Sequence, residues 1–198
     1  LFSFIEAGSS DLYVVPRFRT AFEDPFAELP TLTMLCSFFN KDGEPLESSP
    51  EYTSHKACKA FHEVTGMEFE AMGELEYYVI APDEGVFPAT DQKGYHESAP
   101  YAKFNEFRTE CMHCIAQAGG QIKYGHSEVG NFTLNGLIYE QNEIEFLPCP
   151  AENAADQLMI AKWAIRNLAH EYGYNITFAP KITVGKAGSG LHVHMRIM

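Results

Sequence analysis

The stretch MEFEAMGELEYYVI, residues 67–80, alternates apolar and polar side chains, and this period of two predicts a β-strand. Leu75 and Tyr77 lie on its apolar face, which is expected to pack against a core, while Glu74 and Glu76 lie on the opposite face. One strand therefore points a row of carboxylates in a single direction. The elements on either side of it decide what those carboxylates meet.

The composition excludes two classes of protein. The chain has 198 residues, of which 45% are hydrophobic, and a formal net charge of -13, as in a folded acidic protein. It lacks the basic surface of a nucleic-acid binder, and no apolar run reaches the ~18 residues of a membrane span. Residues 1–11 also lack a signal-peptide pattern. We therefore expect a cytoplasmic protein with no nucleic-acid and no membrane partner.

The surrounding segments predict an α+β fold. Three segments carry apolar residues at helical spacing, and these expected helices span residues 51–65, 104–118 and 154–172. Other segments are typical of strands, at residues 12–15, 31–39, 122–128, 138–147 and 176–178. A long loop is expected over 81–100 and a turn-rich insertion over 131–136. Because strands and helices interleave without strict βαβ repetition, the sheet is expected to be mostly antiparallel.

Two short motifs have ordinary structural interpretations. Cys111 and Cys114 have the spacing of half a zinc site, but both lie on the apolar stripe of a predicted helix and no second pair exists, which favours core packing. The chain's 5 cysteines are scattered and odd in number, so all are expected to be free thiols. The glycine-rich segment 185–190 fails the Walker pattern because a strand-like segment follows it.

Acidic and imidazole side chains recur on the predicted strands. A single glutamate on an open sheet face is most simply a solvated residue. Several strands nevertheless present such groups together, namely Glu74, Glu76, Glu128, Glu143, Glu145, His192 and His194. Clustered carboxylates repel unless a cation holds them, and oxygen-rich ligation with one or two imidazoles favours Mg²⁺ or Mn²⁺ over Zn²⁺. Two such ions are suited to phosphoryl transfer.

Five ordered motifs make this pattern specific. They are Gly73-Glu74-Leu75-Glu76, His126-Ser127-Glu128, Gln141-Asn142-Glu143, Ala179-Pro180-Lys181 and Gly188-Ser189-Gly190-Leu191-His192-Val193-His194. In order and approximate spacing they resemble glutamine synthetase, and the chain is similar to the first half to two-thirds of that family's subunit. Val15-Pro16 and Asp24-Pro25-Phe26 resemble its small β-grasp domain.

The resemblance implies two domains. Residues 1–50, which end in a predicted linker over 44–50, would be part of the N-terminal β-grasp domain. Residues 51–198 would be the first part of a curved, mostly antiparallel catalytic domain of the glutamine synthetase and guanido kinase-like type.

The resemblance also implies an activity, the ATP-dependent ligation of ammonia to the γ-carboxylate of glutamate through a γ-glutamyl phosphate. Two to three Mg²⁺ or Mn²⁺ ions would serve each site, with ATP as a substrate. The implied metal ligands are Glu76, Glu128 and Glu143 for the ion beside glutamate and ammonia, and Glu74 and His192 for the ion on the ATP phosphates.

The remaining implied roles concern substrate contacts. His194 would contact phosphate oxygens, Gly188 would lie by glutamate, and His126 would lie near the nucleotide. The residues expected to act in catalysis are Glu76, Glu128, Glu143 and His194. Glu145 receives no role from the resemblance and is expected to be solvated or supporting.

Three positions depart from the family's common pattern. Ala187 stands where Asn is common beside the substrate, Arg196 stands where Ser is common, and Arg17 follows Pro16 where an acidic residue is frequent. These departures leave open a γ-glutamyl ligase that acts on another amine, or a non-catalytic sensor or scaffold. Guanidino kinase-like chemistry is a third and weaker alternative.

The sequence is expected to be a fragment. It has no initiator Met, and its last predicted strand still alternates at Met198. By resemblance, an Asp-Gly-Ser-Ser loop would precede it, and arginines, a last metal-binding Glu and a flap would follow it, so the chain alone is expected to be catalytically incomplete. Because the family's sites form between subunits, the full-length protein is expected to be a homo-oligomer, a dodecameric double ring.

Overall fold

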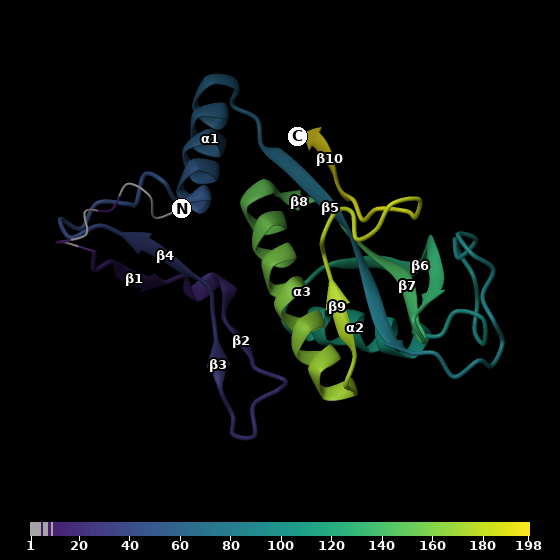
Figure 1. Cartoon of the computed structure of the whole chain (residues 1–198). Coiled ribbons are helices and arrows are strands. Elements are labelled where there is room, and N and C mark those ends of the chain that lie inside the picture. Colours follow the sequence, from purple (N-terminus) through teal and green to yellow (C-terminus); the bar gives the residue numbers. More distant parts are fainter. Residues whose placement is uncertain (1–4, 6–7, 9) are drawn as a thin grey trace. The chain divides into compact units, whose positions relative to one another are not determined.

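The computed structural model describes residue 5, residue 8 and residues 10–198 (Figure 1). Most of residues 1–11, for which no signal peptide was predicted, lie outside the described residues. The chain forms two compact units. The first comprises Leu1–Ala71, Pro148–Asp156 and Met195–Met198, and the second comprises Met72–Leu147 and Gln157–His194.

The first unit contains short antiparallel strand pairs. Strand β1 (Tyr13–Pro16) pairs with β4 (Cys36–Phe39), and β2 (Phe22–Glu23) pairs with β3 (Leu32–Thr33), with a short 3-10 helix, η2, over Phe18–Thr20. The prediction of one strand over 31–39 was wrong because the chain changes partner between β3 and β4. At that break the Leu35 N–H donates to the Thr20 hydroxyl at 2.9 Å instead of to a strand. The β-grasp assignment of residues 1–50 stays a prediction.

Residues 44–50 are packed rather than a free linker. Pro45 forms a β-bridge with Phe39, and Leu46 and Ser49 are buried. Helix α1 (Pro50–Thr65) begins directly after them and ends at Gly66, whose φ of 70° is the left-handed conformation of a C-terminal cap. The helix predicted over 51–65 is therefore confirmed.

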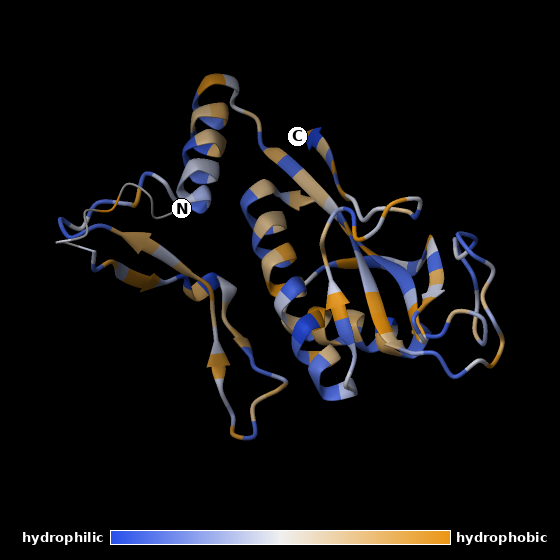
Figure 2. Ribbon diagram, viewed as in Figure 1, coloured by the Kyte–Doolittle hydropathy of each residue, from blue (hydrophilic) through white to orange (hydrophobic). Residues whose placement is uncertain are grey.

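The second unit is built on an antiparallel sheet. Its strands are β5 (Phe69–Pro82), β6 (Ile122–Leu134), β7 (Leu137–Phe146), β9 (Asn175–Thr177) and β10 (Leu191–Ile197). The first residues of β5 and the last of β10 belong to the first unit, as does β8 (Cys149–Pro150), which pairs with the start of β5. The order is β10-β5-β7-β6, and β9 also pairs with β5. Strand β5 carries both hydrophilic and hydrophobic bands, as its alternating sequence predicts (Figure 2). The predicted antiparallel α+β architecture is confirmed.

The β6–β7 hairpin corrects one prediction. Residues 131–134 continue β6 instead of forming a turn-rich insertion, and Asn131 pairs with Glu140. The turn is confined to Asn135 and Gly136, whose φ values of 54° and 75° are left-handed. Asn-Gly between two strands is the strongest short signal of a tight hairpin, and it was present in the sequence.

Helices α2 (Asn105–Gln117) and α3 (Ala151–Tyr172) confirm the two remaining helix predictions. Helix α3 begins three residues earlier than predicted because Pro150, which lacks an N–H, is tolerated where a helix starts. The predicted stripes are largely core: Cys111, Ile115, Ala161, Ile165 and Leu168 are each at most 1% exposed. The assignment of Cys111 and Cys114 to core packing is also confirmed.

Both helices pack on one face of the sheet through glycines. A side chain at Gly73 on β5 would lie 2.8 Å from Leu158 of α3, and one at Gly125 on β6 would lie 2.8 Å from Met112 of α2. Within the described residues, no helix is long and apolar enough to cross a membrane.

The burial of the cysteines predicts their reactivity. Cys36 and Cys58 are partly exposed, whereas Cys111, Cys114 and Cys149 are buried, and burial raises the pKa of the Cys111 thiol well above its ordinary value. In the full-length protein, iodoacetamide should label Cys36 and Cys58 at least about tenfold faster than Cys111, because a buried thiol reacts only after local opening. Mass spectrometry of the labelled peptides measures these rates. Equal labelling of Cys58 and Cys111 would contradict the packing of α2.

Candidate functional site

The strand register forms a row of charged side chains on the face opposite the helices. Glu76 of β5 pairs with Glu143 of β7, and Glu143 pairs with His126 of β6. Directly opposed residues on one sheet face have neighbouring side chains, so two carboxylates and one imidazole are held side by side. His126 Nε2 lies 3.0 Å from a Glu143 carboxylate oxygen.

A second row lies beside the first. Glu74 pairs with Glu145, and Glu145 pairs with Tyr124. Lys123 Nζ binds the Glu145 carboxylate at 2.7 Å. Burial works to raise the pKa of Glu145, but hydrogen bonds from Lys123 and Tyr124 hold that pKa below its ordinary value. Of the two alternatives expected for Glu145, the solvated one was wrong, since Glu145 is 5% exposed and paired, and a supporting role stays a prediction.

The two histidines of β10 contact the same acidic group. His192 Nδ1 lies 3.1 Å from one Glu74 carboxylate oxygen, and His194 Nε2 lies 2.9 Å from the other. His192 also lies 3.8 Å from Glu76. Both imidazoles remain largely exposed, at 63% of the side chain. The structure therefore brings the predicted residues Glu74, Glu76, His192 and His194 together.

Glu128 approaches the first row from an irregular part of β6. The β6–β7 register shifts between Ser127 and Asn131, and in this segment the Val129 N–H donates to the Glu128 carboxylate at 2.9 Å. Glu128 lies 3.8 Å from His126 Nδ1. The position of Glu128 beside the first row therefore depends on this shift in register and not on regular strand alternation alone.

Burial of these groups changes their acidity. Burial raises the pKa of Glu76 and of Glu128, and the nearby Glu143 charge adds to both shifts. Burial works to lower the pKa of His126, but hydrogen bonds to Glu143 and to the Ser127 carbonyl raise it overall. Both His126 ring nitrogens face acceptors, at 2.9 and 3.0 Å, which a protonated imidazolium satisfies.

His126 is also enclosed by aromatic rings. The His96 ring stacks on it at 4.2 Å and the Tyr124 ring at 5.5 Å, while Tyr95 meets it edge-on at 5.4 Å. His96 and Tyr95 belong to the loop between β5 and α2, so this loop forms one wall beside the charged rows.

Gln141 joins the sheet to the glycine-rich segment 185–190 that precedes β10, which we call the glycine loop. Its side-chain N–H groups donate to Glu76 and to the Gly188 carbonyl, each at 2.8 Å, and its side-chain oxygen accepts from the Gly130 N–H at 3.0 Å. Gln141 is 1% exposed, so these bonds are shielded from water. The sequence analysis quoted Gln141 within a motif but predicted no role for its side chain.

Glycines are required in this loop because its backbone lies too close to neighbouring atoms to leave room for a side chain. A side chain at Gly188 would lie 2.4 Å from the Pro180 carbonyl, and one at Gly190 would lie 2.8 Å from both Glu76 and His192. The loop backbone therefore lies close to Glu76 and His192 at Gly190, whereas the neighbours of Gly188 are the Pro180 backbone and the Lys181 side chain. The expectation that Gly188 lies by glutamate stays a prediction.

The loop between β5 and α2 also contacts the glycine loop, through Gln92 and Asp91. The Gln92 side-chain oxygen accepts from the Ala187 N–H at 2.6 Å, and Lys186 pairs with Asp91 at 2.6 Å. Tyr78 donates to the Ala187 carbonyl at 2.8 Å. Ala187 is thus bound through both of its backbone groups and contributes only a methyl group as its side chain.

Among the residues that the structure describes, two groups of side chains have the geometry to hold a cation. The first group consists of Glu74, Glu143 and His192, and the second of His126, Glu143 and Glu145. In each group, the possible ligand atoms lie within 4.8 Å of one another. Glu143 belongs to both. Carboxylate oxygens with one imidazole are a donor set that fits Mg²⁺ or Mn²⁺. The buried, mutually close carboxylates fit that donor set, although Glu76 and Glu128 lie outside these two groups.

The helix-facing side of β7 holds a polar network that sequence reasoning missed. Glu140 is 2% exposed and accepts hydrogen bonds from the backbone N–H groups of Lys103 and Phe104, at the start of α2. Arg108 is buried beside it and donates to Asn142. Alternation along residues 138–147 could have placed Glu140 and Asn142 on the buried face, but not their partners.

A comparison with known proteins identifies relatives for most of the chain. The family model described as "Glutamine synthetase, catalytic domain" matches residues 47–198. Glutamine synthetase of Thermus thermophilus is 27% identical over 207 residues, which cover 98% of this chain and 44% of that protein. The 3-hydroxylaminophenol mutase of Cupriavidus pinatubonensis is 29% identical over 221 residues, which cover 96% and 45%. The chain spans less than half the length of these curated relatives.

One solved structure confirms the fold. The crystal structure described as a novel glutamine synthase homolog superposes with a TM-score of 0.79 over 98% of this chain and 43% of that one. Its sequence identity is 19%, so it is evidence for the fold alone.

The central position of Gln141 predicts a large effect on stability. In Gln141→Leu, the Gly130 N–H, the Gly188 carbonyl and Glu76 lose a shielded partner. The free energy of unfolding should fall by about 2–4 kcal/mol, measured by chemical denaturation. Gln121 is exposed, so Gln121→Leu is the matched control and should have little effect. Equal stability of the two variants would contradict the role of Gln141.

Proposed function

Because the chain belongs to the glutamine synthetase catalytic-domain family, we propose that it forms part of an ATP-dependent ligase that joins ammonia to the γ-carboxylate of glutamate. The observation that carries the proposal is the pair of carboxylate rows on one sheet face, with Glu76 opposite Glu143 and Glu74 opposite Glu145. Glu76, Glu143 and Glu145 are buried, and Glu74 is partly exposed. Glutamate, ammonium and ATP are the proposed substrates, and a ring-shaped homo-oligomer is the proposed assembly.

The proposed site holds divalent cations. Like-charged groups placed directly opposite one another destabilise a sheet, so an acidic cluster of this kind needs a counter-charge. Glu74, Glu76, Glu128, Glu143 and His192 are the proposed ligands of Mg²⁺ or Mn²⁺. When bound, the ions would neutralise charge on the transferred phosphoryl group.

The chain's own residues support the reaction in two ways. His194 is exposed beside Glu74 and is the proposed donor to phosphate oxygens. Gln141 holds Glu76 and the Gly188 backbone in a fixed relation, which positions the proposed glutamate-binding loop. Burial, together with the nearby Glu143 charge, raises the pKa of Glu76 and of Glu128, and a bound cation would offset the crowding of negative charge that contributes to this shift.

The proposed reaction proceeds in two steps. A γ-carboxylate oxygen of glutamate attacks the γ-phosphorus of ATP, which forms γ-glutamyl phosphate and releases ADP. The nitrogen of ammonia then attacks the acyl carbon, phosphate leaves with the bonding electrons, and a proton is lost from nitrogen. His126, between carboxylates and aromatic rings, is the proposed neighbour of the nucleotide.

A second candidate function is a γ-glutamyl ligase that acts on another amine. The observation that favours it is Ala187, whose backbone is bound on both sides and whose methyl group cannot hydrogen-bond a substrate. The relative named 3-hydroxylaminophenol mutase is a similar protein whose name differs from glutamine synthetase. A non-catalytic sensor or scaffold is disfavoured by the intact set of candidate ligands.

The activity itself is tested with the full-length protein. With ATP, glutamate, ammonium and Mg²⁺, phosphate release and glutamine formation should proceed at equal rates. If phosphate is released only when an organic amine replaces ammonium, the second candidate is correct. If both substrates bind but no amine elicits phosphate release, the ligase proposal fails.

The shared position of Glu143 predicts its effect on cation binding. Glu143→Gln removes one charge from both candidate groups, so the affinity for Mn²⁺ should fall at least about tenfold in isothermal titration calorimetry. Glu63→Gln is a matched control, because Glu63 is exposed and paired with Lys59 within α1. Unchanged affinity in Glu143→Gln would remove Glu143 from the site.

The raised pKa values predict a pH dependence of cation binding. Burial raises the pKa of Glu76 and Glu128, so these groups keep their protons to higher pH than exposed glutamates do. Protons compete with the cation, and the affinity for Mn²⁺ should therefore increase as the pH rises from about 5 to about 7.5. Titration calorimetry across this range measures the trend. An affinity that is constant or decreases would contradict ligation by these carboxylates.

A further inference from the structure

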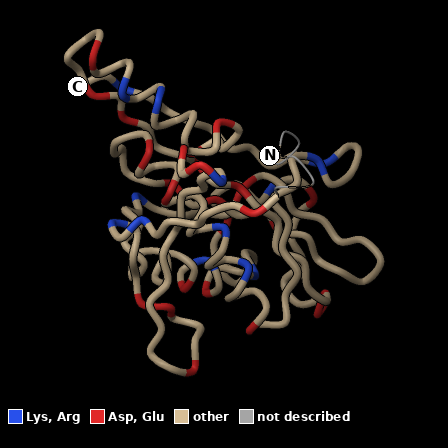
Figure 3. Tube along the Cα trace, turned by 90° about the vertical axis from the view of Figure 1, so that its left-hand side faces the viewer, with Lys and Arg blue, Asp and Glu red and all other residues tan. Residues whose placement is uncertain are grey.

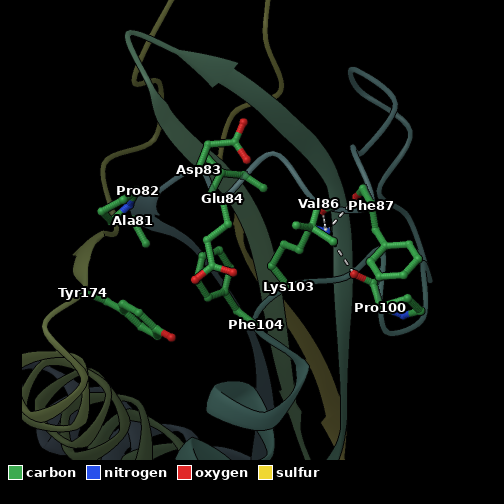
Figure 4. Close-up of a pocket in the computed structure, with 11 residues that line it drawn as sticks. Ala81, Pro82, Asp83, Glu84, Val86, Phe87, Pro100, Lys103, Phe104 and Tyr174 are labelled. Carbon is green, nitrogen blue, oxygen red and sulfur yellow. Dashed lines mark hydrogen bonds between the residues drawn. The ribbon is translucent and has the colours of Figure 1, made fainter.

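A pocket of about 390 Å³ lies at the far end of β5, away from the charged rows (Figure 4). We propose that it binds a small organic cation, an ammonium group attached to an aromatic or apolar body, at a site separate from the proposed ligase site. Its volume is within the range of about 300–1,000 Å³ that is typical of small-molecule sites.

The walls of the pocket are apolar and aromatic. Phe104 and Tyr174 form one side, with their ring centroids 5.1 Å apart in an edge-to-face arrangement. Ala81 and Pro82 at the end of β5 and Phe87 of the following loop complete the lining that Figure 4 shows. Aromatic faces attract cations as well as apolar groups. The Lys103 ammonium group already lies over the Phe87 ring, 5.5 Å from its centroid, so Phe104 and Tyr174 are the rings that suit the body and the charge of such a ligand.

Glu84 supplies the negative charge. Its carboxylate lies between Tyr174 and Lys103 in Figure 4 and forms no hydrogen bond or ion pair within the described part of the chain. The neighbouring Asp83 is already engaged, because it accepts hydrogen bonds from Thr133 and from the Gly85 N–H, each at 3.0 Å. Glu84 is therefore the group with capacity for a ligand cation.

Lys103 does not neutralise Glu84. Its ammonium group donates to the carbonyls of Val86, Phe87 and Pro100, with the last two at 2.6 and 3.1 Å. An ammonium group has three donors, and these carbonyls use all of them. Lys103 thus stabilises the loop that lines the pocket. The Glu84 carboxylate remains able to pair with a cationic ligand.

The floor of the pocket is rigidly supported. Glu140 accepts hydrogen bonds from the backbone N–H groups of Lys103 and Phe104, and it is 2% exposed on β7. The backbone that carries the Phe104 side chain is therefore held by the sheet. When a pocket is already formed in the free protein, ligand binding costs little conformational entropy.

Two aromatic probes of similar size and opposite charge test the proposal. Phenethylammonium should bind to the full-length protein, and phenylacetate should bind at least about tenfold more weakly, both measured by saturation-transfer NMR. Glu84→Gln should weaken phenethylammonium about fivefold, as expected for a partly exposed ion pair. Glu63→Gln, on the exposed face of α1, should leave the affinity unchanged.

Competition separates this pocket from the ligase site. Saturating ATP, glutamate and Mg²⁺ should not displace phenethylammonium, and Glu143→Gln should bind it with unchanged affinity. Displacement by these substrates, equal binding of phenylacetate, or an unchanged affinity in Glu84→Gln would each overturn the proposal. Because every readout is binding, these outcomes are independent of whether the protein proves to be a ligase.

Discussion

The register that aligns β5, β7 and β6 places like charges directly opposite one another, and much of the second unit is arranged around this repulsion. Glu76 faces Glu143 and Glu74 faces Glu145, all on the sheet face away from α2 and α3. A slip of one residue would move every one of these side chains to the helix-facing side. The glycines that allow the helices to pack closely on that other side therefore also fix the acidic face. Across the chain as a whole, acidic positions outnumber basic ones, 27 to 14 (Figure 3).

Local partners offset part of the repulsion without removing the capacity for a cation. Lys123 pairs with Glu145, His126 lies against Glu143, and Gln141 donates to Glu76. The same contacts extend outward from the sheet. Gln141 also binds the glycine loop, and that loop is held in turn by the segment between β5 and α2. Two loops that are far apart in the sequence are thus tied to one acidic face.

The sequence predicted the parts of this arrangement that depend on local periodicity. Alternation along 67–80 located β5 and the side to which Glu74 and Glu76 point, and helical spacing located α1, α2 and α3 within a few residues. Features that depend on partners were missed. The strand over 31–39 is divided by a change of partner, and the irregular register near Glu128 arises from pairing with β7. Glu145 and Glu140 are buried because of Lys123 and the start of α2, and neither contact is visible in composition or spacing. The Asn135-Gly136 turn is different, since its signal was present and was overlooked.

The chain belongs to the glutamine synthetase catalytic-domain family and shares its fold. Which amine the proposed ligase accepts would depend on positions such as Ala187. The central claim is that the acidic face is a binding site for divalent cations. Anomalous diffraction from crystals of the full-length protein grown with Mn²⁺ tests it most directly. The account predicts peaks about 2–2.5 Å from carboxylate oxygens of Glu143 and of its neighbours Glu74 or Glu76. Peaks confined to other parts of the molecule, or no peak at saturating Mn²⁺, would contradict it.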